Sequence, residues 1–363
     1  MSKQRIVVKI GSSSLTNPQG ELDKRKLTEH VEAIARLRQQ NHDVVLVSSG
    51  AVASGFSKIG YASKPVTVKG KQAAAAVGQG LLIQTYMEKF AEFRLTAAQL
   101  LLTREDFTTR SRYKNVFNTM MELLERRVIP IINENDTVSI NELTFGDNDM
   151  LSALVSGIVH ADQLMMLTDI NGLYNGNPRT NPDVVKYDYL EMITEEMIAA
   201  AESNGSSVGT GGMKSKLEAA RMALSLGVNV FIGTGEGERK LLEIISGDGD
   251  GTYISNKSKV TVNTNRQWIA LHSETMGKIY VDEGAEKAIL YQGASLLSAG
   301  IKKIKGTFQE GDVVEVYGIK GLIGKGEVSC SAAIVNKEME ERNTDNSCLS
   351  SRVIHRDRWV RLK

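Results

Sequence analysis

The sequence contains few cysteines, prolines and aromatic residues, and these shortages exclude several classes of protein. Among its 363 residues are only 2 cysteines, Cys330 and Cys348, which are too few for a disulfide framework. The five histidines are scattered, and no cysteine and histidine cluster has zinc spacing. The N-terminus lacks a secretory signal, and no apolar run approaches membrane-spanning length. We therefore expect a soluble protein of the reducing cytosol with no membrane partner.

Neither sign of charge dominates the sequence. The 44 Lys and Arg residues nearly cancel the 43 Asp and Glu residues, which leaves a formal net charge of +1. Nucleic acids and anionic membranes attract strongly basic proteins, so this balance favours a small-molecule substrate instead. With 41% hydrophobic residues and 5 prolines, the chain can bury a large core. We expect two domains, or one large domain with an appendage.

In the first two-thirds of the chain, short apolar runs alternate with longer segments of helical period. The expected strands are 6–10, 44–47, 97–102, 128–132, 164–167 and 228–232, each almost continuously apolar, as in strands covered on both faces. The expected apolar helix stripes are Leu27, Val31, Ile34 and Leu37; Phe117, Met120, Met121 and Leu124; and Leu151, Leu154, Val155 and Ile158. This alternation predicts an α/β three-layer sandwich with a mainly parallel sheet, whose ligands bind at the carboxyl ends of the strands.

The pattern changes after about residue 258. Short alternating runs with frequent glycines follow at 277–281, 311–317 and 326–328, and they indicate a small β-rich domain. We place the first domain at 1–258 and the second at 272–363. The polar, unpatterned segment 338–351 predicts a loop or a mobile segment.

The most informative stretch is Gly209–Lys216, which runs directly into an apolar helical pattern. Its glycines free backbone N–H groups to surround an anion, the helix N-terminus adds its dipole, and Lys214 and Lys216 add charge. The stretch therefore predicts a phosphate cradle, although its spacing is not that of the usual P-loop. The alternative is a glycine-rich surface turn that caps a helix.

Other polar loops lie at the ends of expected strands or before an expected helix. They are Lys9–Ser14, Ser48–Ala51, Asn133–Asp136, Gly146–Asp149 and Thr168–Tyr174. Each could by itself be a simple turn, and Asp147 or Asn148 could be the N-cap of the following helix. Together, the lysines, carboxylates and glycines of these loops favour a nucleotide site at one edge of the sheet.

The motifs in these loops make the chain resemble the amino-acid kinase family, and the likeness covers essentially its whole length. The matching stretches are Val7–Gly11, Ser48–Ala51, Ile132–Asp136, Gly146–Asp149 and Gly209–Met213. The later segments Val281–Ala285 and Gly300–Lys302 resemble the PUA domain, which elsewhere often binds RNA.

The resemblance implies transfer of the ATP γ-phosphoryl group to the side-chain carboxylate of L-glutamate, as the first step toward proline. It also implies feedback inhibition by proline, a homo-oligomer, and glutamyl phosphate reductase as a possible partner. The chemistry agrees with the residues, because a carboxylate with a pKa of about 4.3 is already ionised at neutral pH and needs no general base. The remaining tasks are neutralising charge and aligning the two reactants.

The resemblance also assigns roles to the catalytic positions. Lys9 and Lys216 would flank the transferring phosphoryl group and neutralise its oxygens. The backbone N–H groups of Gly11 and Gly50 would assist, and Asp149 would orient the two lysines.

Binding positions follow from the same resemblance. Ser49, Asp136 and Asn148 would bind L-glutamate. The residues that match the family's nucleotide site are Lys9, Thr168, Asp169, Thr210, Gly211, Gly212, Met213, Lys214, Ser215 and Lys216. Mg²⁺ would bridge the ATP phosphates, held mostly by phosphate oxygens and water, and we assign no side chain to it.

Two other interpretations stay open. The C-terminal domain could bind RNA, because the segment 352–363 contains five basic residues and a single acidic residue, Asp357. A solvated tail or a regulatory or assembly element explains that stretch better, since basic residues barely outnumber acidic ones over 275–363. The kinase could also act on aspartate, carbamate or a nucleoside monophosphate, but the C-terminal module and the Ile132–Asp136 stretch argue against these acceptors.

Overall fold

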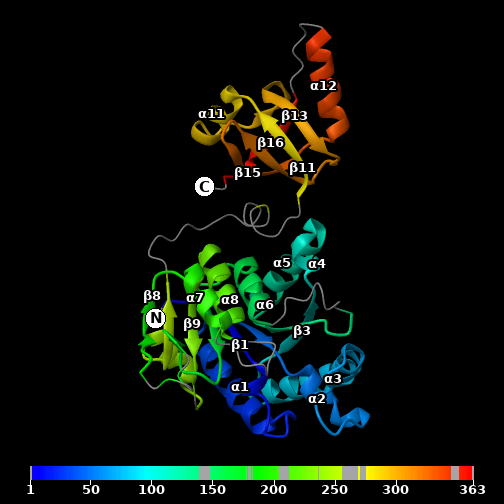
Figure 1. The fold of residues 1–363 in the computed structure, drawn as a ribbon. Coiled ribbons are helices and arrows are strands. Elements are labelled where there is room, and N and C mark those ends of the chain that lie inside the picture. The colour runs from blue at the N-terminus through cyan, green and yellow to red at the C-terminus, as the bar shows by residue number, and fades with distance from the viewer. Residues whose placement is uncertain are drawn as a thin grey trace. The chain divides into compact units, whose positions relative to one another are not determined.

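The computed structural model describes residues 2–138, 148–176, 178, 181, 183–203, 212–235, 237–255, 269, 275–344 and 351–361. The chain divides into two compact units (Figure 1). One consists of Met1–Asp106 with Lys114–Thr261, and the other of Phe107–Tyr113 with Val262–Lys363. No helix in the described ranges is both long enough and apolar enough to cross a membrane.

A mainly parallel sheet forms the centre of the first unit, which confirms the expected α/β class. In spatial order its described strands are β3 (Ala97–Leu102), β4 (Ile129–Glu134), β2 (Asp43–Ser48), β1 (Arg5–Ile10), β5 (Gln163–Leu167), β9 (Asn229–Gly233), β10 (Gly251–Ile254) and β8 (Tyr189–Leu190). Only the pairing of β10 with β9 is antiparallel within this described sheet. A small ribbon, β6 (Leu173–Tyr174) with β7 (Lys186–Tyr187), follows β5.

Helices surround this sheet (Figure 1). They are α1 (Lys24–Gln39), α2 (Ala51–Gly55), α3 (Val68–Glu92), α4 (Glu105–Thr108), α5 (Arg110–Glu125), α6 (Asn148–Ile158), α7 (Glu195–Ser203), α8 (Met213–Ser225) and α9 (Lys240–Ser246), with short 3₁₀ turns η1 (Ser12–Ser14) and η2 (Ser57–Ile59). Helices α1, α3 and α9 bury their apolar residues against Ile6, Val8 and Ile10 of β1. Because side chains alternate along a strand, Val7 and Lys9 point to the opposite face, where α6 packs on α8.

Two expectations about the burial of these strands and helices were wrong. Strand β3 is not covered on both faces, because it lies at the edge of the sheet, and Leu101 is 37% exposed. Helix α5 exists, but its buried stripe is Tyr113, Val116, Met120 and Leu124, with Phe117 and Met121 only half-buried. The other two stripes are buried as expected.

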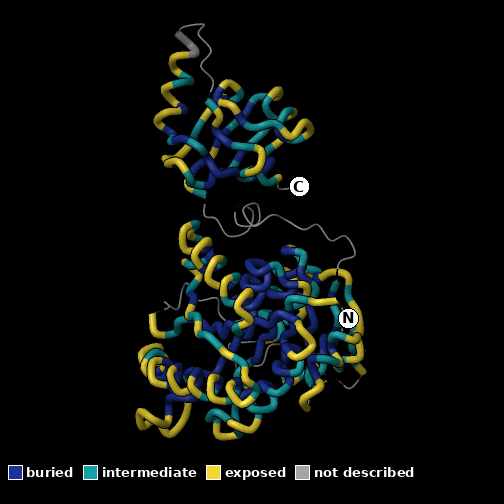
Figure 2. Tube along the Cα trace, turned by 180° about the vertical axis from the view of Figure 1, so that it is seen from behind, coloured by how far each residue is buried: buried dark blue, intermediate teal, exposed yellow. Residues whose placement is uncertain are grey.

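The second unit is the expected small β-rich domain. Its described sheet has the order β12 (Leu296–Leu297), β16 (Arg352–Arg361), β15 (Gly321–Val328), β14 (Val313–Gly318), β11 (Thr275–Val281) and β13 (Ile301–Gly306). Helices α11 (Glu283–Tyr291) and α12 (Ala332–Thr344) and the turn η3 (Ser298–Gly300) complete it. Figure 2 shows that each unit has buried residues of its own, and in this one they form a separate apolar core around Ile279, Val314 and Val353.

The C-terminal segments differ from what the sequence predicted. Residues 338–344 are not a loop, because α12 continues to Thr344, with Val335 buried and Met339 packed on the core. The basic end of the chain is not a solvated tail, because β16 pairs with β15 and buries Val353 and Ile354. In these two segments, a few apolar residues at helical or strand spacing are enough to form a packed helix and a paired strand, although most of the residues are polar. Residues 345–350 lie outside the described ranges.

Candidate active site

Polar side chains gather where four neighbouring strands of the first unit end. Lys9 lies at the end of β1, Ser49 follows β2, Asn133 lies at the end of β4, and Thr168 follows β5. The chain passes from β1 to β2 on one side, whereas β5 pairs with β1 on the other. Such a reversal of strand order opens a crevice at the carboxyl ends of the strands, where α/β proteins bind ligands.

The centre of this region is a buried carboxylate held by two lysines. Lys9 Nζ lies 2.5 Å from Asp149 Oδ1, and Lys216 Nζ lies 3.1 Å from Asp149 Oδ2. Asp149 is 0% exposed, Lys9 2% and Lys216 7%. Ser215 Oγ also donates to Asp149 Oδ2, at 2.9 Å. The structure therefore brings together three residues that are far apart in the sequence.

Local structure explains this convergence. Lys9 points from β1 toward the face covered by α6 and α8. Asp149 lies in the first turn of α6, where the helix dipole favours a carboxylate. Lys216 lies in the first turn of α8, and α6 packs against α8. Two ammonium groups and one carboxylate leave one net positive charge in a desolvated place, which suits a bound anion such as a phosphoryl group.

A second polar cluster lies beside this centre. Asn148 Nδ2 donates to Ser49 Oγ at 2.9 Å and to Asn133 Oδ1 at 3.0 Å. Asn133 Nδ2 in turn donates to Gln79 Oε1 at 2.9 Å. Asn148 is not an N-cap, because it is the first residue of α6 and its side chain reaches across to β2 and β4. Gly146 and Asp147 lie outside the described residues.

Two groups in this region, the side-chain amide oxygen of Asn148 and the carboxylate of Asp136, suit a cationic or hydrogen-bond-donating ligand. Asn148 Oδ1 is buried and has no hydrogen-bond partner among the described residues. Burial raises the pKa of Asp136, and Lys64 only partly counteracts this. A carboxylate that has lost hydration without gaining a strong partner is stabilised when an ammonium group binds beside it.

The described residues among those expected to bind the nucleotide include the loop after β5 and the first turn of α8. Thr168 follows β5, donates from its backbone N–H to Gly233 O at 2.9 Å, and donates from Oγ1 to Asp169 Oδ1 at 3.2 Å. Gly212 is the exposed N-cap of α8 and provides no side chain to cap it, so the first-turn N–H groups are not capped there. Met213, Lys214 and Ser215 are half-buried in that first turn. Thr210 and Gly211 lie outside the described residues.

The two glycines expected near the phosphoryl group have different constraints. Gly50 has φ 109°, in the left-handed region that favours glycine, and it turns the chain from β2 into α2. Gly11 has φ −75°, which any residue adopts. A Cβ at Gly11 would lie 3.4 Å from Lys9 Nζ, in van der Waals contact with the ammonium group.

Sequence reasoning missed Gln79 and gave Asn133 no separate role. Gln79 lies on α3, a helix far from any of the quoted motifs, yet its side chain is buried and bonded to Asn133. The available signal was a glutamine on the buried face of α3, where the other buried residues are glycine, alanine, leucine, isoleucine and aromatic residues. For metals, no group of three His, Cys, Asp or Glu residues in the described ranges could hold an ion.

Comparison with known proteins agrees with this geometry. The model of the amino acid kinase family matches residues 4–234. The chain belongs to the amino acid kinase family. The PUA domain model matches residues 277–347, within the second unit.

Several curated members of the family match over the full length. Glutamate 5-kinase 1 of Bacillus licheniformis is 59% identical over 100% of both chains, and glutamate 5-kinase 1 of Bacillus subtilis is 58% identical over the same share. Glutamate 5-kinase of Oceanobacillus iheyensis is 56% identical over 99% of this chain and 97% of its own.

A solved structure shares the fold of the first unit. A carbamate kinase from Giardia lamblia, bound to AMP-PNP, has a TM-score of 0.51 at 15% identity and covers 70% of this chain and 99% of its own. At that identity the likeness shows the amino acid kinase fold alone.

Proposed function

We propose that this kinase transfers the γ-phosphoryl group of ATP to the side-chain carboxylate of L-glutamate and forms L-glutamyl 5-phosphate. The observation that carries the proposal is the full-length likeness to glutamate 5-kinases at up to 59% identity. The buried group of Lys9, Asp149 and Lys216 supports it, since its net positive charge suits phosphoryl transfer between two anions.

The transfer itself needs little from the protein beyond charge and alignment. A carboxylate oxygen of glutamate forms a bond to the γ-phosphorus, and the bond to the β,γ-bridging oxygen breaks with its electron pair on ADP. Lys9 and Lys216 neutralise the phosphoryl oxygens, and Asp149 keeps both ammonium groups in place. Losing one such stabiliser costs roughly two to three orders of magnitude in rate.

Glutamate binding is assigned to the neighbouring cluster. Asp136, whose burial raises its pKa, pairs with the substrate ammonium group. Asn148 and Ser49, which are hydrogen-bonded to each other, bind the polar groups of the substrate L-glutamate. The hydrogen bond from Asn133 to Gln79 fixes the position of Asn133, and so of the Asn148 side chain bonded to it.

ATP and Mg²⁺ fit the remaining residues. The α8 N-terminus, which no N-cap side chain covers, together with Lys216, suits the phosphates of ATP, and Thr168 and Asp169 lie at the end of the adjoining strand β5. Gly11 and Gly50 supply backbone N–H groups at the ends of β1 and β2. Mg²⁺ bound to ATP neutralises phosphate charge, and oxygens of ATP and water supply most of its ligands.

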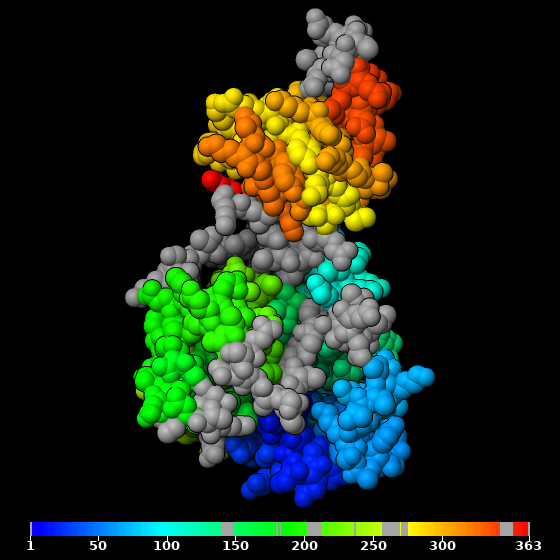
Figure 3. All heavy atoms as spheres, in the orientation of Figure 1, coloured from blue at the N-terminus to red at the C-terminus, as the bar shows by residue number. Residues whose placement is uncertain are grey.

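The likeness to glutamate 5-kinases also supports a cellular location, a pathway step and an assembly state for this enzyme. It acts in the cytoplasm at the first step of proline biosynthesis, is inhibited by proline, and delivers its acyl phosphate to glutamyl phosphate reductase. It assembles with copies of itself. Helix α3, on the surface of the first unit (Figure 3), exposes Val77, Leu81 and Met87, which suits such an assembly.

The test is ATP-dependent hydroxamate formation from hydroxylamine, with L-glutamate and L-aspartate in parallel reactions containing Mg²⁺. Hydroxamate from glutamate alone, abolished by EDTA and reduced by proline, is the expected result. No product from glutamate, in a folded protein that still binds ATP, would contradict the assignment of the acceptor.

A second candidate function, RNA binding by the second unit, is favoured by one surface. The rings of Tyr280 on β11 and Tyr317 on β14 stack with centroids 5.2 Å apart. Lys278 Nζ lies over the Tyr317 ring at 5.2 Å, and Lys305 Nζ over the Tyr280 ring at 5.7 Å. Aromatic rings flanked by lysines suit stacked bases and phosphates of a single strand.

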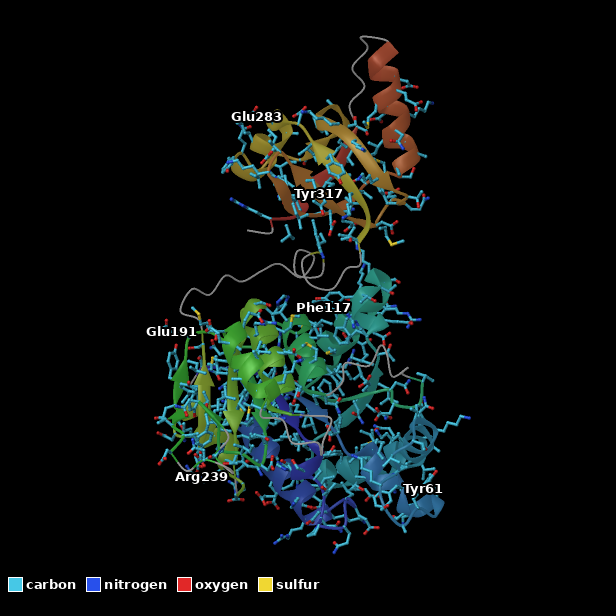
Figure 4. All side chains as sticks on the ribbon, in the orientation of Figure 1. Tyr61, Phe117, Glu191, Arg239, Glu283 and Tyr317 are labelled. Atoms are coloured by element: carbon cyan, nitrogen blue, oxygen red, sulfur yellow. The ribbon has the colours of Figure 1, made fainter. Side chains whose placement is uncertain are left out.

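This candidate is tested with the full-length protein and a labelled uridine 20-mer across a salt series. Binding that weakens with salt, and weakens further in a Tyr280→Ala, Tyr317→Ala double variant, would support it. Tyr61 of the first unit, labelled with Tyr317 in Figure 4, provides the matched control as Tyr61→Ala. Equal binding by all three proteins would exclude this surface.

A further inference from the structure

The turn that follows Lys9 is closed by its own backbone but has no side-chain cap. Ser14 N donates to Gly11 O at 3.1 Å, Leu15 N donates to Ser12 O at 3.0 Å, and no side chain caps the start of η1. This turn begins at Gly11, whose backbone N–H is assigned to the phosphoryl group; a Cβ added to Gly11 would lie 3.4 Å from Lys9 Nζ. Its position therefore affects the reacting centre. Thr16 Oγ1 donates to Ser12 O at 3.0 Å, and side chains of helix α1 add to this hold on the turn.

Helix α1 holds this turn through two side chains one helical turn apart. Lys26 Nζ donates to Thr16 O at 2.7 Å, and His30 Nε2 lies 3.1 Å from Ser14 O. Residues four positions apart share one face of a helix, so both side chains reach the same segment. Lys26 Nζ also donates to Ser13 O, at the longer distance of 3.5 Å, so the bond from His30 is the shorter of the two contacts to η1.

The geometry defines the state of His30. A carbonyl oxygen can only accept, so Nε2 carries a hydrogen, and in a neutral ring Nδ1 then carries the lone pair. His30 is 6% exposed, and its Nδ1 is buried without a hydrogen-bond partner among the described residues. A leucine would pack beside Leu27 and Val31 without leaving such a nitrogen unpaired. The bond to Ser14 is thus the physical reason for an imidazole at this place.

The surroundings keep this imidazole neutral. Burial, followed by the nearby Lys240, lowers the pKa of His30 to about 4, although the bond to Ser14 and the charge of Glu29 act in the opposite direction. Lys26 adds to the lowering. A neutral ring has a single N–H, and in this structure that N–H is directed to the turn.

We propose that His30 is a positioning residue, which holds the Gly11–Ser14 turn by donating from Nε2 to the Ser14 carbonyl. Gly11 and Lys9 then stay aligned with Asp149 and Lys216 for phosphoryl transfer. His30 does not touch the reacting groups, and its role acts through the turn. The inference rests on the proposed function, because it assigns the effect to that reaction.

The experiment compares His30→Leu and His30→Gln with wild type at saturating ATP and L-glutamate. Small displacements of a reacting group can cost up to about 100-fold in rate, so we expect His30→Leu to lower kcat by about 10- to 100-fold. Both KM values should change less than about threefold, because the binding cluster at Asn148 is untouched. His30→Gln keeps an N–H donor and should recover a large part of kcat.

His42 is the matched control. It is 1% exposed, its Nδ1 accepts from Gln4 N at 3.1 Å, and its Nε2 is buried without a partner in the described structure. It precedes β2 and therefore lies at the opposite end of the sheet from the site. His42→Leu should lose thermal stability like His30→Leu but keep its kcat.

Three outcomes would overturn the inference: an unchanged kcat in folded His30→Leu, an equal loss of kcat in His42→Leu, or no recovery in His30→Gln. Hydrogen exchange separates these from a failure of the proposed function. Amides of residues 11–16 should exchange faster in His30→Leu than in wild type or His42→Leu, whatever the substrate. If wild type makes no glutamyl phosphate, the proposed function fails, and equal exchange in all three proteins would overturn the role of His30 as well.

Discussion

Lys9 and Lys216 are held on the two different oxygens of one carboxylate, that of Asp149, at 2.5 and 3.1 Å. One lysine comes from the central strand and the other from the first turn of a helix. The carboxylate therefore sets the separation of the two cations before any substrate binds. Preorganised charge of this kind needs no rearrangement when charge develops in the transition state.

We expect Asp149→Asn to lower kcat by about 100-fold or more, because an amide no longer holds both ammonium groups. The change also leaves two buried cations facing each other, so thermal unfolding should be measured alongside the rate of hydroxamate formation. Asp248→Asn, in an exposed loop of the same unit, is the control. A folded Asp149→Asn protein with wild-type kcat would remove Asp149 from the mechanism.

Lys216→Ala should stay folded and bind glutamate while turning over poorly, because the lost charge acts mainly in the transition state. Steady-state kinetics and calorimetric titration with glutamate separate the two effects. Arg221→Ala, on the exposed side of the same helix and paired with Glu195, should leave turnover intact. Normal turnover in Lys216→Ala would show that the charge is not used.

Asp136→Asn should raise the KM for glutamate more than the KM for ATP, since the ammonium group loses its carboxylate. The same change should raise the melting temperature of the ligand-free protein, because burial raises the pKa of Asp136 and its ionised form destabilises the folded state at neutral pH. Kinetics and thermal unfolding on one preparation test both signs. Equal impairment with both substrates would refute the assignment to glutamate.

The raised pKa of Asp136 also predicts a pH effect. Protonation removes the charge that attracts the ammonium group, and a raised pKa starts that loss at a higher pH than for a solvated aspartate. As the pH is lowered, the KM for glutamate should therefore begin to rise at a higher pH than the ordinary pKa of an aspartate would give. In Asp136→Asn this part of the pH dependence should be absent, and an identical profile in both proteins would contradict the prediction.

Asn148→Ala should likewise raise the KM for glutamate more than the KM for ATP. It removes the donor to Ser49 and Asn133 and the buried, unpaired Oδ1. Measuring glutamate affinity by calorimetry checks that binding and not turnover is affected. Gln84→Ala, a solvent-facing amide on α3 bonded to Glu88, is a suitable control.

The lowered pKa of His30 predicts that the folded protein loses stability in acid. Its pKa is about 4 in the folded protein and 6.5 as the ordinary value, so below pH 6.5 the unfolded chain binds the proton more readily. The free energy of unfolding should fall between pH 6.5 and 4, by on the order of 3 kcal/mol from this group. Urea unfolding at pH 7 and pH 5 should show a smaller difference in His30→Gln than in wild type, and an equal difference would contradict the shift.

Much of the fold follows from local pattern. The strands β1, β2, β4, β5 and β9 lie within two residues of the predicted apolar runs, because continuous apolar segments of that length are buried as parallel strands. The loops at their ends were predicted together with them, since polar residues directly after such strands meet at one edge of a sheet. Local pattern failed at α12, where three apolar residues among many polar ones were enough to dock a helix.

The sequence by itself determined the alternation of strands and helices, the polar residues that end them and, through the quoted motifs, the family. Only the tertiary structure decided which of these residues meet. The pairing of β1 with β5 and the packing of α6 on α8 bring Lys9, Asp149 and Lys216 together. Gln79 and His30 lie on helices without any motif. Gln79 reaches Asn133, and His30 reaches the turn after Lys9, only because of how those helices pack. Contacts between residues far apart in the chain depend on packing that a local pattern does not contain.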